Sequence, residues 1–73
     1  MTELEAIEIA KNESKIQDWP WIEPILIKKQ KQFMLFGKTI WRVMTNSESR
    51  GGNINIWIED KTGKILQKAF AKR

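Results

Sequence analysis

The chain of 73 residues contains no cysteine and no histidine, and these two absences exclude several kinds of site. Without cysteine the chain can form neither a disulfide nor a thiolate metal site. Without histidine, zinc, copper and iron lose their usual nitrogen ligands, and a catalytic triad lacks its base. Carboxylate sites for magnesium or calcium remain open, but no acidic loop has EF-hand spacing. We expect no catalytic residue, no metal site and no cofactor.

Long hydrophobic runs are absent as well. No stretch approaches the roughly 20 consecutive apolar residues of a membrane span. Residues 1–15 carry acidic groups where a signal peptide carries basic ones, and no apolar segment of the length of a signal sequence follows. These features predict a cytoplasmic protein without a membrane span.

The composition is that of a folded protein. Apolar residues make up 41% of the chain and charged residues 30%, as is usual for globular domains. Four tryptophans and three phenylalanines supply large apolar groups for a small core. A chain of this length holds one domain, so we expect residues 1–73 to form a single unit.

Residues 2–16 have the pattern of an amphipathic helix. Thr2 and Glu5 have the spacing of a capping box, in which each side chain accepts a hydrogen bond from the other residue's backbone. At about 100° per residue, one broad face of the helix is apolar. That face contains Ala6, Ile7, Ile9 and Ala10.

Two prolines end the helical pattern. Pro20 and Pro24 cannot continue a helix, so residues 17–24 are predicted to form a linker. Its two tryptophans, Trp19 and Trp21, are expected to fold back onto the core rather than remain in water.

Residues 25–70 have the character of a sheet. Strands are predicted at residues 25–31, 39–45, 53–59 and 65–70, with a turn or bulge at Gly37. The first of these is the least regular, which leaves the number of strands at three or four. The polar segment 46–52 between two of the strands gives few reasons to expect an ordered loop.

The strand at residues 53–59 shows the clearest alternation. Ile54, Ile56 and Ile58 lie on one face, and Trp57 lies on the other. An antiparallel sheet with one apolar face needs a cover, and the N-terminal helix is the element that can supply it. The predicted fold is therefore α+β, an N-terminal helix packed on a three- to four-stranded antiparallel sheet.

The acidic pair Glu59 and Asp60 lies in a hairpin, with sequence EDKTG. We interpret this segment as a structural turn in which Asp60 caps the backbone and Gly63 adopts a positive φ. Neighbouring residues of a strand point to opposite faces, so the two carboxylates are not expected to converge on one ion.

The face of the sheet opposite the helix is the candidate interaction face. It should carry Ile40, Arg42 and Met44 from one strand and Trp57 from the next. An apolar patch with an outward aromatic residue usually marks an interface. The occupant could be an unknown protein, or a second copy that pairs through an edge strand to form a homodimer.

Charge is distributed unevenly along the chain. Residues 1–24 contain six acidic and two basic side chains, whereas residues 25–73 contain three acidic and eleven basic ones. A basic sheet with an outward Trp57 suggests an alternative function, binding of single-stranded nucleic acid. The same lysines could instead discourage pairing between sheet edges. The predicted basic patch consists of Lys28, Lys29, Lys31, Lys38 and Arg50.

Three segments, EAIEIAKN, GKTIWRVMT and GGNINIWIEDKTGKIL, resemble small domains of the PepSY-like and cystatin/NTF2-like types. They are also similar to the NTF2-fold immunity proteins of bacterial toxin systems. The resemblance implies a non-catalytic protein-binding or inhibitory module, with a toxin-neutralising immunity protein as a further alternative. It transfers no catalytic residue to this chain.

Overall fold

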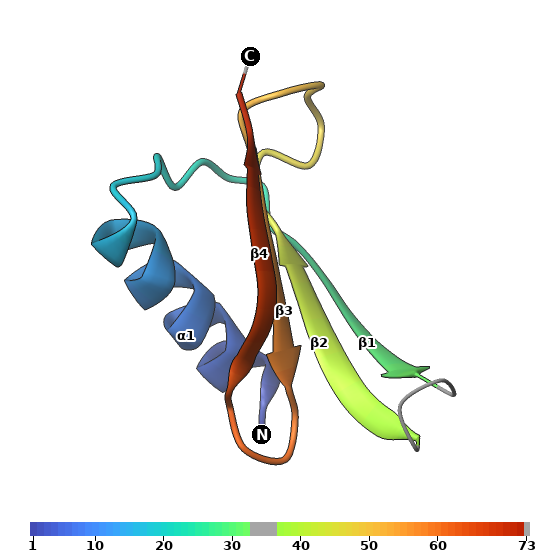
Figure 1. The fold of residues 1–73 in the computed structure, drawn as a ribbon. Coiled ribbons are helices and arrows are strands. Elements are labelled where there is room, and N and C mark those ends of the chain that lie inside the picture. Colours follow the sequence, from blue (N-terminus) through green and yellow to red (C-terminus); the bar gives the residue numbers. More distant parts are fainter. Residues whose placement is uncertain (33–36, 73) are drawn as a thin grey trace.

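A computed structural model describes residues 1–32 and 37–72, and within them the chain forms one helix and four strands (Figure 1). The strands form one antiparallel sheet in the order β1-β2-β3-β4, and the helix lies against one of its faces. The predicted α+β fold is confirmed, with four strands. The elements are α1 (Glu3–Ile16), β1 (Leu26–Gln32), β2 (Lys38–Met44), β3 (Asn53–Glu59) and β4 (Ile65–Ala71).

Helix α1 begins at the predicted capping box. The backbone N–H of Glu5 donates to Thr2 Oγ1 at 3.2 Å, and the backbone N–H of Thr2 donates to Glu5 Oε1 at 2.8 Å. Two of the N–H groups that every helix leaves free at its start are thereby satisfied. Within residues 1–32 and 37–72, no helix is long and apolar enough to cross a membrane.

The core lies between α1 and the facing side of the sheet. Ile54, Ile56 and Ile58 of β3 are completely buried there, as the alternating pattern predicted. Ala6 and Ala10 of α1 are also 0% exposed, and their small side chains let the helix approach the strands closely. Trp41 and Val43 of β2 complete the buried cluster.

The linker tryptophans fold back as predicted. Trp19 and Trp21 are half-buried and pack against the core cluster. The ring of Trp19 stacks on that of Phe70 in β4, with 5.7 Å between the centroids. These contacts tie the segment after α1 to the last strand, at the end of the sheet opposite the N-terminus (Figure 1).

The loop between β2 and β3 is organised, so the expectation of a poorly ordered segment was wrong. The side-chain amide of Asn53 donates to the carbonyls of Thr45 at 2.9 Å and Asn46 at 2.7 Å. Its Oδ1 accepts from the backbone N–H of Gly51 at 3.0 Å. Asn53, which organises the loop, is the first residue of β3. Its place in the alternating pattern of the strand gave no sign of these loop contacts.

The turn predicted at Gly37 lies partly outside the described residues, because residues 33–36 are not among them. Gly37 itself has a φ of +72°, a conformation that glycine adopts without strain.

Candidate interaction face

The side of the sheet opposite α1 is called the outer face. Within the described residues no helix or strand lies over it (Figure 1). The strand register aligns one row of side chains across all four strands, because directly opposite residues of an antiparallel pair share a face. That row consists of Lys28, Arg42, Trp57 and Gln67.

Arg42 and Trp57 form the centre of this row. The guanidinium carbon of Arg42 lies 5.3 Å from the centroid of the Trp57 ring, a cation–π arrangement. One terminal nitrogen of Arg42 donates to Asn55 Oδ1 at 3.0 Å. Both side chains are half-buried, so each is held by its neighbours yet still reaches the surface. Among the described residues the buried Nε of Arg42 has no hydrogen-bond partner.

Ile40 is not available on the outer face, which corrects the predicted set of contact residues. Although its position in β2 is on this side, only 1% of its surface is exposed. Its neighbours in register, Gln30 and Glu59, flank it from both sides. Lys38, two residues earlier in β2, also reaches across to Glu59 at 3.0 Å. Met44 remains half-buried, so the accessible part of the predicted face is Arg42, Met44 and Trp57.

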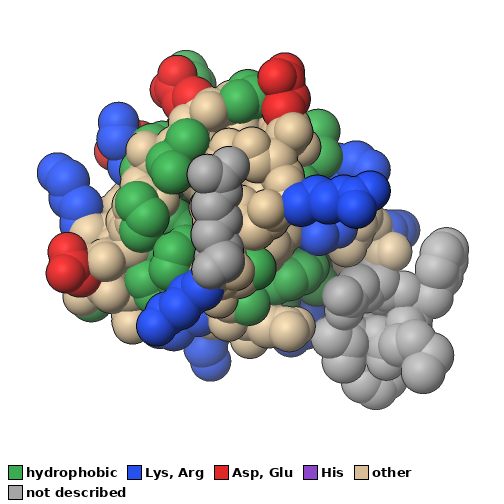
Figure 2. Space-filling view, turned by 90° about the horizontal axis from the view of Figure 1, so that it is seen from above, with side chains coloured by type: hydrophobic (Ala, Val, Ile, Leu, Met, Phe, Trp, Pro, Cys, Tyr) green, Lys and Arg blue, Asp and Glu red, His purple; other side chains and the backbone are tan. Residues whose placement is uncertain are grey.

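The predicted basic patch does not form one surface. Lys28 is on the outer face opposite Arg42, whereas Lys29 and Lys31 are on the side of the helix. The ammonium of Lys29 lies 5.2 Å from the centroid of the Trp41 ring on that side. Lys38 begins β2, and Arg50 lies in the loop that follows the other end of β2. Figure 2 shows basic side chains at several separate places around the face in view.

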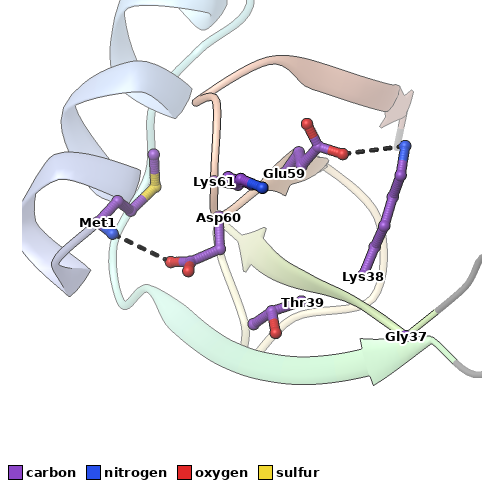
Figure 3. Close-up of a pocket in the computed structure, with 7 residues that line it drawn as sticks. All are labelled: Met1, Gly37, Lys38, Thr39, Glu59, Asp60 and Lys61. Carbon is purple, nitrogen blue, oxygen red and sulfur yellow. Dashed lines mark hydrogen bonds and ion pairs between the residues drawn. The ribbon is translucent and has the colours of Figure 1, made fainter.

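The hairpin between β3 and β4 borders an open hollow of about 580 Å³ (Figure 3). Its acidic groups are already paired with a cation or with nearby donors. Glu59 forms the ion pair with Lys38 and accepts from Thr62 Oγ1 at 2.6 Å. Within residues 1–32 and 37–72, no three acidic side chains come together as a metal site would require. The hollow is lined by Met1, Gly37, Lys38, Thr39, Glu59, Asp60 and Lys61.

Asp60 has a different role from the predicted one. Its Oδ1 accepts from the indole Nε1 of Trp41 at 2.6 Å and from the amino group of Met1 at 3.2 Å. It therefore anchors the buried Trp41 and the start of the chain rather than capping the turn. The turn itself agrees with the prediction, because Gly63 has a φ of +74° and its N–H donates to the Glu59 carbonyl at 2.8 Å.

Hydrogen bonds lower the pKa of several carboxyl groups. The indole N–H of Trp41 and then the Met1 amino group hold the pKa of Asp60 below its ordinary value of 3.8. Thr62 and then Lys38 lower the pKa of Glu59, and Lys68 followed by Gln17 lowers that of Glu13. A lowered pKa in the folded chain means that the ionised carboxylate stabilises the fold.

The stability of the chain should therefore fall in acid. The contribution of these carboxylates is present above their unfolded pKa values and is lost as the pH falls through the lower folded ones, from about pH 5 downward. We expect Asp60→Asn to reduce the difference in melting temperature between pH 7 and pH 3, because the variant has no charge to lose at this position. Glu48→Gln, which removes one charge from an exposed loop residue, is the control. Equal differences for the parent and Asp60→Asn would contradict the assignment.

Comparisons of the chain with protein-family models, with curated proteins and with solved structures find no match. The resemblance to PepSY-like and NTF2-like domains therefore stays a prediction. Within the described residues, the outer face carries the most developed arrangement of surface side chains, centred on Arg42, Trp57 and Asn55.

Proposed function

We propose that this chain is a non-catalytic module that binds a partner protein through the outer face of its sheet. The observation that supports this function is the Arg42–Trp57 pair, which occupies the middle of a sheet face over which none of the described helices or strands lies. Tryptophan and arginine are the residue types most enriched where interfaces concentrate their binding energy. Because the ring, the guanidinium and Asn55 already hold one another, little side-chain entropy is lost when a partner binds.

The charge of the outer face favours a partner with acidic groups. Lys28 and Arg42 are neighbours in the central row, and the only acidic residue on this side of the four described strands is Glu59. The carboxylate of Glu59 is already paired with Lys38. Complementary charge on the partner would steer its approach and fix its orientation. An inhibitory or toxin-neutralising role would also require this face to bind a partner protein. The identity of that partner distinguishes the two roles from other kinds of protein binding.

Binding of single-stranded nucleic acid has less support. Arg42 lies over the Trp57 ring and covers one side that a base would need for stacking. The lysines of β1 are divided between the two faces of the sheet, so the described strands carry no continuous basic track along the outer face. A protein partner requires neither feature.

The proposal predicts that Trp57→Ala and Arg42→Glu each weaken partner binding at least tenfold. The partner is first recovered from a native lysate with the parent chain and identified, and its Kd is then measured by calorimetry for each variant. Trp57→Ala removes the ring that Arg42 rests on, and Arg42→Glu opposes the acidic groups of the partner.

Lys11→Glu is the matched control for charge reversal, because Lys11 is exposed on α1, on the other side of the sheet. Circular dichroism of each variant checks that the fold is retained. Parental Kd values for both outer-face variants would rule out this face. Tight binding to single-stranded oligonucleotides that weakens steeply with salt would replace the protein partner by nucleic acid.

A further inference from the structure

The two free edges of the sheet differ in charge. β1 carries three exposed lysines, Lys28, Lys29 and Lys31, and lysines on an edge strand discourage pairing with another strand. β4 carries one charged side chain, Lys68. Its ammonium is held 2.8 Å from Glu13 Oε2 of α1, so this charge is already compensated. The edge of β4 therefore lacks the protection that the edge of β1 has.

Apolar side chains reach the surface next to β4. Leu66 is 39% exposed, and Ala69 and Ala71 are exposed. Ile16 of α1 is 66% exposed, and it lies three residues after Glu13, on the flank of the helix that reaches Lys68. An unprotected strand edge with apolar neighbours is a template for another strand.

We propose that β4 pairs antiparallel with β4 of a second copy of this chain, about a two-fold axis at Ala69, so that the two sheets become one. The partner strand is assigned to a second copy because, in this register, no charged residue of β4 is directly opposite a residue of like charge in β4 of the other copy. An axis perpendicular to the sheet keeps both helices on the same side, and Lys68 of each copy is then directly opposite Phe70 of the other. No two like charges face each other in this register.

Other two-fold registers are less favourable. An axis at Lys68 would place the two ammonium groups directly opposite each other, and an axis at Phe70 would place Lys68 opposite Lys72. An axis at Gln67 would move the pairing toward Leu66, where β4 is irregular because the register with β3 shifts between Trp57 and Ile58. Pairing about Ala69 uses the regular part of β4, residues 67–71.

This inference concerns the edge of the sheet and does not depend on the partner-binding proposal, which concerns the outer face. Its consequence for that face is geometric. The two outer faces would lie on the same side of one continuous sheet. Their rows of Lys28, Arg42, Trp57 and Gln67 would be offset by four residues along the strands, because each Gln67 would be opposite Ala71 of the other copy.

A pair of cysteine variants tests the pairing and its register. The chain has no cysteine of its own, so Ala69→Cys introduces its only thiol. At the axis the two Cα atoms would be about 4.5–5.5 Å apart, within reach of a disulfide. Ala71→Cys is the matched control, because Ala71 is the same residue type on the same strand and face and is also exposed. The two copies of residue 71 would be separated by about 13 Å along the strand, too far for a disulfide.

Under mild oxidation we expect Ala69→Cys to form a covalent dimer at least tenfold faster than Ala71→Cys, measured on non-reducing gels. Light scattering of the parent chain should give twice its mass of 8.6 kDa at high concentration. Equal cross-linking rates would overturn the register. A parent chain that stays monomeric at the highest concentration measured would overturn the dimer itself, and neither result would affect the binding test on the outer face.

Discussion

Ile56→Ala is expected to lower the free energy of unfolding by about 2–5 kcal/mol, which is most of the stability that a domain of this size has. Ile56 is 0% exposed in the middle of β3, between Ile54 and Ile58, and it pairs with Val43 of β2. Truncation removes buried apolar surface and leaves a cavity that the flanking strands fill only in part. Guanidinium denaturation followed by tryptophan fluorescence measures the loss, since the chain has four tryptophans.

Leu4→Ala is the control for this prediction. Leu4 is 75% exposed on α1, so removing its side chain should change the free energy of unfolding by no more than about 0.5 kcal/mol. Similar losses for the two variants would mean that the isoleucines of β3 do not form the core that the helix covers.

Asn53→Ala is expected to cost about 2 kcal/mol or more, although it replaces a polar residue at the start of a strand. The variant leaves the carbonyls of Thr45 and Asn46 without their amide donor, and the Gly51 N–H without its acceptor. These are backbone groups of a closed loop, and backbone polar groups left unpaired away from water are costly. Urea denaturation measures the loss, and hydrogen exchange should show faster exchange at the Gly51 amide.

Asn55→Ala provides the comparison for Asn53→Ala, because it removes the same side chain two residues later, on the same face of β3. Asn55 accepts one hydrogen bond, from Arg42, so its replacement should cost less, about 1 kcal/mol. A loss as large as that of Asn53→Ala would show that the loop does not depend on the amide of Asn53.

Alternation along the strands predicted some features of the outer face and not others. The period of two correctly places Arg42 and Trp57 on the side opposite the helix, but their contact depends on the register between β2 and β3. The same period, applied to β1, would have separated Lys29 and Lys31 from Lys28 and so divided the predicted basic patch. The burial of Ile40 had no such signal, because alternation gives the face on which a side chain lies and not how much of its surface is exposed.

The sequence by itself determined the elements whose signals are local. The capping box at Thr2 and Glu5 starts α1, and the three alternating isoleucines define the buried side of β3. Each of these signals involves residues close in the chain, so it acts through hydrogen bonds and periodicity that do not depend on the rest of the fold.

Only the tertiary structure decided which distant side chains meet. Asp60 binds the indole of Trp41, 19 residues earlier, and Lys68 binds Glu13, 55 residues earlier. Such pairs arise once the strand register and the position of the helix are set, and many side chains of the same types compete for each partner. For that reason the row at the centre of the outer face and the unprotected edge of β4 become visible in the folded chain and not in its sequence.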